Sequence, residues 1–216
     1  QTTLETMGKI IPDLLFISDE ENHSSIIQGL RHSKCRKEIF KHNDVQDLES
    51  ILMSNPGPKC VVFESVYSMD GDIAPVKEII EVSKKYNAIT YIDEVHAVGL
   101  YGETGAGICE RDKVEVDIIN GTLAKAYGVQ GGYITGKREF IDAIRSMASA
   151  FIFTTSLSPV ICAGALTSIK YVKDHPELRE KIQERARKTK EEIERQGIEV
   201  LKNDSHIVPV IIGDPI

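Results

Sequence analysis

The chain alternates short apolar runs with amphipathic segments through most of its length. Runs of four to six residues rich in Val, Ile, Phe or Tyr predict strands at 14–18, 60–64, 89–93, 117–120, 131–135 and 151–154. Apolar residues spaced i, i+3, i+4 and i+7 predict helices at 23–31, 45–53, 75–86 and 138–148. Because strands separated by helices of this length favour parallel pairing, the pattern predicts an α/β fold with a mostly parallel sheet sandwiched by helices.

The last third of the chain has a different character. Residues 159–172 predict an apolar helix, and residues 176–196 predict a long helix whose charged side chains form a solvated face. A new strand pattern begins after Gly197. We therefore expect a major domain over residues 1–158. Residues 159–216 are expected to hold connecting helices and the start of a smaller α+β domain that is cut short.

Composition and charge exclude several classes of protein. The 216 residues are 41% hydrophobic and 27% charged, which is typical of a globular protein and excludes disordered, collagenous and disulfide-stapled chains. The 33 acidic residues outnumber the 26 basic ones, so a basic nucleic-acid-binding surface is not expected.

Cysteine placement and hydropathy point to an internal compartment. The four cysteines are scattered without a CxxC pair, which predicts reduced thiols and no metal site. No run approaches the roughly 18 apolar residues of a membrane span, so no membrane partner is expected. The sequence therefore predicts a protein of the cytoplasm or of an organelle matrix.

Polar residues follow three of the predicted strands where the chain leaves the sheet. Asp93 ends one apolar strand and is followed by His96; Lys125 follows another, three residues after Thr122 in a turn bounded by glycines. A third strand ends in a hydroxyl-rich turn that contains Ser68. Ligands of parallel α/β sheets collect at the carboxyl ends of strands, so these turns are the candidate site.

Each of these residues also has a structural explanation. An aspartate at a strand end is usually a cap or turn residue, and a single lysine is usually a surface charge. His96 could be a core histidine, and the SMDG run could form only a type I turn. Their joint occurrence on successive strand ends favours a site. The chain has no GxSxG, GxxxxGK[ST] or GxGxxG run, which argues against a serine hydrolase, a P-loop enzyme and a dinucleotide-binding enzyme.

A lysine among small residues, an aspartate on a neighbouring strand and several hydroxyl groups suit pyridoxal 5'-phosphate (PLP). The lysine amine forms a Schiff base with the cofactor aldehyde. An aspartate opposite the ring nitrogen keeps that nitrogen protonated, which lets the ring accept carbanion charge. Threonine and serine hydroxyls then hold the phosphate.

The same residues resemble a known family. The chain contains the runs SDEENHSSIIQGLRHS, IFKHNDVQDLE, VVFESVYSMDGDIAP, YIDEVHAVGLYGETGAG, DIINGTLAKAYGVQGGYI and FIFTTSLSP. Together they resemble the 5-aminolevulinate synthases, which are α-oxoamine synthases within the fold-type I PLP-dependent enzymes. The runs DEVHAVGLYG and GTLAKAYG are the most specific, whereas sister enzymes share SMDG.

The resemblance implies roles for individual residues. Lys125 would be the Schiff-base lysine and the acid/base that removes the glycine α-proton. Asp93 would pair with the pyridinium nitrogen, His96 would bind the ring hydroxyl, and His23 would stack on the ring. The remaining implied contacts are Ser68 at the cofactor, Thr122 with Thr154 and Thr155 of the partner subunit at the phosphate, and Ser18 and Lys37 at succinyl-CoA. For Lys37, a plain surface charge is an equally good explanation.

The implied reaction condenses glycine with succinyl-CoA to give 5-aminolevulinate, CoA and carbon dioxide, a step of heme and tetrapyrrole biosynthesis, in a homodimer with shared active sites. Alternatives are a sister enzyme, either 8-amino-7-oxononanoate synthase or 2-amino-3-ketobutyrate CoA ligase, and a dimerising remnant without catalysis. Family members are about twice as long and contain a glycine-rich cofactor loop and a complete C-terminal domain. The resemblance therefore predicts that this chain alone binds PLP weakly and is inactive.

Overall fold

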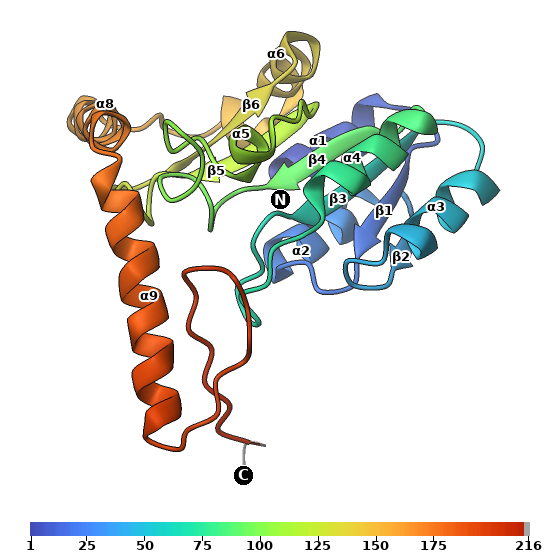
Figure 1. The fold of residues 1–216 in the computed structure, drawn as a ribbon. Coiled ribbons are helices and arrows are strands. Elements are labelled where there is room, and N and C mark those ends of the chain that lie inside the picture. Colours follow the sequence, from blue (N-terminus) through green and yellow to red (C-terminus); the bar gives the residue numbers. More distant parts are fainter. Residues whose placement is uncertain (214–216) are drawn as a thin grey trace.

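A computed structural model of the chain describes residues 1–213 and contains one six-stranded sheet between helices (Figure 1). The strands are β1 (Leu15–Asp19), β2 (Arg36–Phe40), β3 (Lys59–Glu64), β4 (Ile89–Asp93), β5 (Ile118–Thr122) and β6 (Gly132–Gly136). Their order is β2-β1-β3-β4-β5-β6, with parallel pairing throughout except for the antiparallel pair of β5 and β6. The predicted mostly parallel α/β fold is confirmed.

Capping side chains or a proline mark the start of several helices. They are α1 (Thr2–Ile10), α2 (Ser24–Ser33), α3 (Val45–Ser54), α4 (Val76–Lys85), α5 (Ile108–Asp112), α6 (Arg138–Met147), α7 (Ser149–Ile152), α8 (Pro159–Asp174) and α9 (Glu177–Arg195). Asp44 accepts hydrogen bonds from two N–H groups in the first turn of α3. Ser158 caps α8 in the same way, just before a proline at the first helical position. Such caps stabilise a helix end by about 1 kcal/mol.

The central strands are buried on both faces, which explains their nearly continuous apolar runs. Phe16 and Val62 belong to a core formed with α1, α2 and α6. The next residues along the same strands, Ile17 and Phe63, belong to the core formed with α3, α4 and α5. Because successive strand residues point to opposite faces, each central strand supplies both cores.

Four elements differ from the sequence expectation. The helices α1 and α5 and the strand β2 were not expected. The sequence pattern does not predict β2, because β2 is an edge strand whose first four residues are exposed and mostly polar, so it lacks an apolar run. The predicted strand at 151–154 is wrong, since residues 149–152 form α7. There the Ile152 and Phe153 N–H groups bond the Ala148 and Ser149 carbonyls. These local bonds satisfy the backbone without a neighbouring strand, and a four-residue apolar run does not distinguish the two outcomes.

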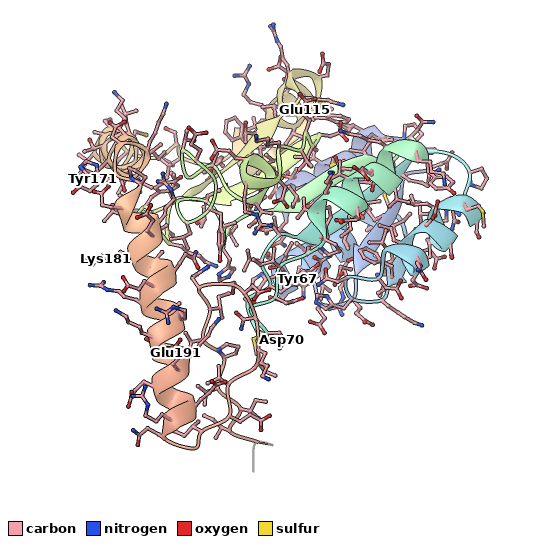
Figure 2. All side chains as sticks on the ribbon, viewed as in Figure 1. Tyr67, Asp70, Glu115, Tyr171, Lys181 and Glu191 are labelled. Carbon is pink, nitrogen blue, oxygen red and sulfur yellow. The ribbon has the colours of Figure 1, made fainter. Side chains whose placement is uncertain are left out.

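The helices α8 and α9 stand apart from the sheet, and the chain after α9 runs back beside α9 (Figure 1). The expected strand pattern after Gly197 forms only an isolated antiparallel bridge between Val200 and Val210. Lys190 anchors this segment by donating to the carbonyls of Asn203 and Ser205, and Asn203 Nδ2 donates to the Asp70 carbonyl at 3.0 Å. Lys181 and Glu191 project from α9 in Figure 2. Among residues 1–213, no helix is both long and apolar enough to cross a membrane.

Candidate active site

Three polar side chains form a row across the carboxyl ends of the central strands. In the sheet register, Glu64 of β3 pairs with Asp93 of β4, and Asp93 pairs with Asn120 of β5. Residues in register on adjacent strands point to the same face, so the row faces the layer that contains α1 and α2. Asn120 Nδ2 donates to Asp93 Oδ2 at 3.0 Å, and the Val95 N–H donates to Asp93 Oδ1 at 3.0 Å.

Both carboxyl groups of this row are buried, and burial raises the pKa of each. Asp93 is 4% exposed and Glu64 is 2% exposed. Burial raises the pKa of Glu64 to about 8, although the His23 N–H donates to Glu64 Oε1 at 2.5 Å. Burial also raises the pKa of Asp93, against the hydrogen bonds from Val95 and Asn120 and the charge of Lys125. The row therefore places two carboxyls of altered acidity side by side.

A tight turn after β5 carries Lys125. The Leu123 N–H donates to the Gly131 carbonyl, and Thr122 Oγ1 accepts from the Ala124 N–H at 3.1 Å. Gly128 adopts a positive φ of 66°, which glycine tolerates without strain. From the other side, α8 supports the turn, since Ser168 Oγ donates to the Tyr127 carbonyl at 2.8 Å. The lysine is thus held on a backbone fixed at several points.

The amine of Lys125 meets the ring of His96, with 2.5 Å between Nζ and Nε2. Burial, followed by the charge of Lys125, lowers the pKa of His96 to about 4, so the ring is neutral near pH 7. Burial also lowers the pKa of Lys125, while Asp93 and Glu64 oppose this shift. A lysine whose pKa is lowered exposes a larger fraction of neutral amine, the form that attacks a carbonyl or accepts a proton.

Of the sequence-predicted residues, the structure brings His23, Asp93, His96 and Lys125 together. His23 is exposed, precedes α2 and affects the pKa of both Asp93 and His96 through its charge. Thr122 lies next to this cluster and shapes the lysine turn. The placement agrees with a shared site, while the role of each residue stays a prediction.

The other predicted residues lie outside this cluster. Ser18 is buried in β1, where its hydroxyl donates to the Asp19 carbonyl and accepts from Asn22. Lys37 is exposed on the edge strand β2, Ser68 is half-buried in the turn after β3, and Thr154 and Thr155 are exposed after α7. Within residues 1–213, none of these five shares a hydrogen bond or ion pair with Asp93 or Lys125.

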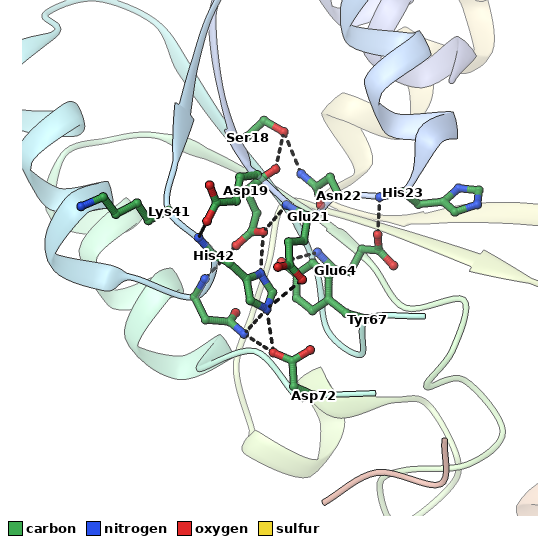
Figure 3. A network of polar contacts seen from close by, with 12 residues as sticks. Ser18, Asp19, Glu21, Asn22, His23, Lys41, His42, Glu64, Tyr67 and Asp72 are labelled. Carbon is green, nitrogen blue, oxygen red and sulfur yellow. Dashed lines mark hydrogen bonds and ion pairs between the residues drawn. The ribbon is translucent and has the colours of Figure 1, made fainter. Parts of the chain in front are cut away.

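Several polar residues of this edge were not found from the sequence. Glu64 and Asn120 reach the site because they are register partners of Asp93, and the sequence does not reveal register. Glu94 points to the opposite side of its strand from Asp93; its carboxylate accepts from Ser65 Oγ at 2.8 Å and from two N–H groups at the start of α5. A further network joins Asp19, His42 and Asp72 (Figure 3). In the described part of the chain, no cluster of His, Cys, Asp and Glu suits a metal ion.

Comparison with curated proteins identifies close relatives. The chain is 57% identical over 219 aligned residues to the 5-aminolevulinate synthase of Rickettsia bellii, covering 100% of this chain and 53% of that protein. It is 52% identical to the mitochondrial 5-aminolevulinate synthase of Schizosaccharomyces pombe, covering 98% of this chain and 39% of that protein. The chain thus spans about half the length of most of the curated relatives it matches, and less of the mitochondrial one.

Solved structures share the fold. A structure of serine palmitoyltransferase (SPT) with PLP superimposes with a TM-score of 0.90 at 34% identity, covering 99% of this chain and 56% of that one. An 8-amino-7-oxononanoate synthase from Francisella tularensis gives a TM-score of 0.82 at 22% identity, covering 98% of this chain and 63% of that one, which supports the fold alone. The family model for class I and II aminotransferases matches residues 1–216. The chain therefore belongs to the class I and II aminotransferase family.

Proposed function

We propose that this chain is the cofactor-binding part of a 5-aminolevulinate synthase, an enzyme that condenses glycine with succinyl-CoA. The names of relatives that are 50 to 57% identical over the whole chain support this activity. The observation that carries it is the Lys125 amine, held 2.5 Å from a neutral His96 beside the buried carboxyl of Asp93. This arrangement suits PLP chemistry and not a general hydrolytic site.

The residues fit PLP. When bound, PLP supplies an aldehyde for the lysine and a protonated ring that accepts electron density. Asp93, fixed by Val95 and Asn120, would hold the proton at the ring nitrogen through a charge-assisted hydrogen bond. Lys125 would carry the cofactor through its amine; once the amine of glycine has displaced it, the freed neutral amine would remove the proton from the glycine α-carbon. His96 would contact the ring hydroxyl and orient the lysine.

The remaining contacts are also part of the proposal. Thr122 lies at the start of the lysine turn, where its hydroxyl donates to the Gly131 carbonyl; it would turn this single O–H to a bound phosphate. Ser68 would lie at the cofactor, and Ser18 and Lys37 would contact succinyl-CoA. We divide the chain into a PLP-binding domain, residues 1–158, and connecting helices with the start of a smaller domain, residues 159–216.

A homodimer would complete the site. Around α7 and the start of α8 lies an exposed apolar strip, in which Met147 is 59%, Phe151 61%, Phe153 86% and Val160 80% exposed. Exposed apolar surface of this kind marks protein interfaces. Thr154 and Thr155 belong to the same segment, so pairing through this strip would deliver their hydroxyls to the partner's phosphate site. The bacterial and mitochondrial relatives support the cytoplasm or the mitochondrial matrix as the compartment.

Sedimentation tests the dimer. We expect the chain to sediment as a dimer and the variant Phe153→Ser to dissociate at concentrations where the parent remains paired, because the strip would carry a polar group at its most exposed position. A substitution on the solvated side of α9, Lys181→Ala, is the control and should not change the mass. A monomeric parent chain at high concentration would contradict the proposed pairing.

Cofactor titration tests the activity. Adding excess PLP to the chain should produce an absorbance band, and borohydride should fix the cofactor to Lys125. The variant Lys125→Ala should lose the band completely, while the exposed-lysine control Lys181→Ala should keep it. A folded parent chain that forms no band, or a band that survives in Lys125→Ala, would leave the non-catalytic remnant as the better explanation.

The choice of acyl donor tests the substrate. A protein that joins this chain to the flanking segments of its relatives should turn over succinyl-CoA at least tenfold faster than acetyl-CoA or pimeloyl-CoA. Preference for either of the other donors would instead assign the chain to 2-amino-3-ketobutyrate CoA ligase or 8-amino-7-oxononanoate synthase, respectively.

A further inference from the structure

A second histidine at the same edge of the sheet is enclosed by acids. His42 follows β2, and its side chain is 18% exposed. Its Nδ1 lies 2.8 Å from Asp19 Oδ1, and its Nε2 lies 2.7 Å from Asp72 Oδ2 (Figure 3). Asn43 Nδ2 donates to the same Asp72 oxygen at 2.5 Å. Since each ring nitrogen faces a carboxylate, both nitrogens carry a proton and the ring is a cation.

The charged and titratable groups that surround this ring are nearly all acidic. Glu21 Oε2 is 3.6 Å from Nε2, and Glu20 accepts a hydrogen bond from the His42 backbone. The ring of Tyr67 meets the imidazole edge-on, with 4.4 Å between centroids. Within residues 1–213, every ion pair of Asp19, Glu21 and Asp72 is made with His42. Although burial opposes protonation, the bonds to Asp19 and Asp72 raise the pKa of His42 to about 10.

The Asp19 side of the network reaches the turn that precedes α2. Asp19 Oδ1 accepts from the Glu21 N–H at 2.9 Å as well as from His42, and Oδ2 accepts from the Asn43 N–H at 3.0 Å. The turn formed in this way ends at His23, whose N–H donates to Glu64 in the row of the candidate site. The position of His23 thus depends on a turn that Asp19 and His42 close.

The Asp72 side reaches the loop after β3. Within this loop the Tyr67 N–H donates to the Asp72 carbonyl at 3.1 Å, and the Gly71 N–H donates to the Tyr67 carbonyl at 3.1 Å. Ser68 lies between these two bonds. On the far side, Asn203 donates to the Asp70 carbonyl. The loop is therefore held by His42 on one side and by Asn203, in the segment after α9, on the other.

We propose that His42 is a positioning residue for the active site: its ring, held between Asp19 and Asp72, ties the turn that carries His23 to the loop that carries Ser68 and fixes both against the carboxyl end of the sheet. The coupling of the two segments stands on the contacts alone. Its consequence for PLP rests on the proposed function, in which His23 and Ser68 contact the cofactor.

Amide hydrogen exchange tests the coupling without any cofactor. In His42→Gln, which is uncharged and donates from one nitrogen only, we expect exchange protection at residues 20–23 and 67–72 to fall together by at least tenfold. His42→Arg, a cation with several donors, should restore most of the protection. His175→Gln is the control, because His175 follows α8, stacks on Tyr171 and belongs to neither segment.

The pH dependence separates positioning from simple packing. In the parent chain the protection of both segments should be greatest near pH 6 and decline together as the pH rises from 6.5 toward 10, the range over which the stabilisation by the charged ring is lost. In His42→Gln this joint decline should disappear. A loss of protection confined to residues 41–43, or different pH midpoints for the two segments, would overturn the proposal.

Cofactor affinity provides the second readout. His42→Gln should still form the Lys125-dependent absorbance band, but with a dissociation constant for PLP at least fivefold higher than that of the parent and of His175→Gln. If the parent forms no band, the proposed function fails while the exchange result still decides the coupling. If His42→Gln does not fold, Asp72→Asn replaces it, since this variant breaks one contact and should free residues 67–72 more than residues 20–23. Equal protection and equal PLP affinity in all variants would overturn the proposal.

Discussion

His96 and His42 occupy the same edge of one sheet and have opposite acid-base properties. The pKa of His96 is lowered to about 4, whereas that of His42 is raised to about 10. Burial lowers the pKa in both cases. The difference arises from the partners, because His96 faces a lysine amine and His42 faces two aspartates. The first ring is therefore neutral and available for chemistry, and the second is a fixed cation that holds backbone segments.

The comparison also separates two kinds of carboxylate. Asp19 and Asp72 contact a cation directly. Asp93 and Glu64 are buried with only backbone and amide donors, and the pKa of each is raised. The carboxylates of Asp19 and Asp72 therefore stabilise the structure. The raised pKa values of Asp93 and Glu64 are those expected of groups that bind or exchange a proton.

The largest expected effect concerns Asp93. Asp93→Ala should weaken PLP binding about 10- to 100-fold, because a charge-assisted hydrogen bond to the ring nitrogen is worth roughly 1.5 to 3 kcal/mol. Absorbance titration measures the affinity, and Asp13→Ala, at an exposed turn residue, is the matched control. Unchanged affinity in Asp93→Ala would mean that the ring nitrogen does not contact Asp93. The contrast between a reactive His96 and a structural His42 would then lose its support.

The second effect concerns stability and His42. Its pKa is raised from 6.5 to about 10 on folding. The stabilisation is thus complete below pH 6.5 and is lost as the pH rises toward 10. After allowance for solvent screening, we expect the parent to lose on the order of 1 kcal/mol across this range relative to His42→Gln. Urea unfolding at a series of pH values measures it; parallel curves for the two proteins would show that the ring is not a buried cation.

The third effect concerns the reciprocal influence of Lys125 on His96. Lys125→Met removes the like charge beside the ring, so the pKa of His96 should rise from about 4 while burial keeps it below 6.5. Ring chemical shifts in an NMR titration follow this change, and the pKa of His42 should stay where it is in the same sample. A His96 pKa that does not move would mean that burial alone accounts for its low value.

The smallest effect concerns Glu64. The charge of Glu64 opposes the lowering of the pKa of Lys125, so Glu64→Gln should lower that pKa further. The pH at which half of the chain carries PLP on Lys125 should shift to lower values, by less than in a variant that lacks Asp93, because Asp93 has the larger influence on the lysine. A shift toward higher pH would contradict the placement of Glu64 beside the amine.

The sequence predicted the strands and turns with strong local signals. The apolar run of β4 and the glycines around Lys125 placed Asp93, His96 and Lys125 at one edge because parallel strands end together. The sequence did not predict β2, whose exposed residues lack an apolar run, or α7, whose short apolar segment fits either conformation.

The row of Glu64 and Asn120 and the His42 network could not be predicted for a different reason. Glu64 and Asn120 meet Asp93 through sheet register, which depends on how separate strands align. The network joins residues 19, 42 and 72, which come from three segments with no shared pattern. Long-range alignment is set by the packing of the whole sheet, so contacts of this kind emerge only from the folded chain.

The two acids at the end of β4 show how much depends on that alignment. Asp93 is close enough to Lys125 for the lysine charge to lower its pKa, and its neighbour Glu94 points to the opposite side, where it accepts hydrogen bonds from Ser65 and the start of α5. Inserting or deleting one residue within β4 would exchange these two directions, since side chains alternate along a strand. Glu94 would then point toward Lys125 in place of Asp93. Ser65 and the start of α5 would lose the hydrogen bonds that Glu94 accepts. Such a one-residue shift should abolish the proposed activity while the strand content of the protein stays almost the same.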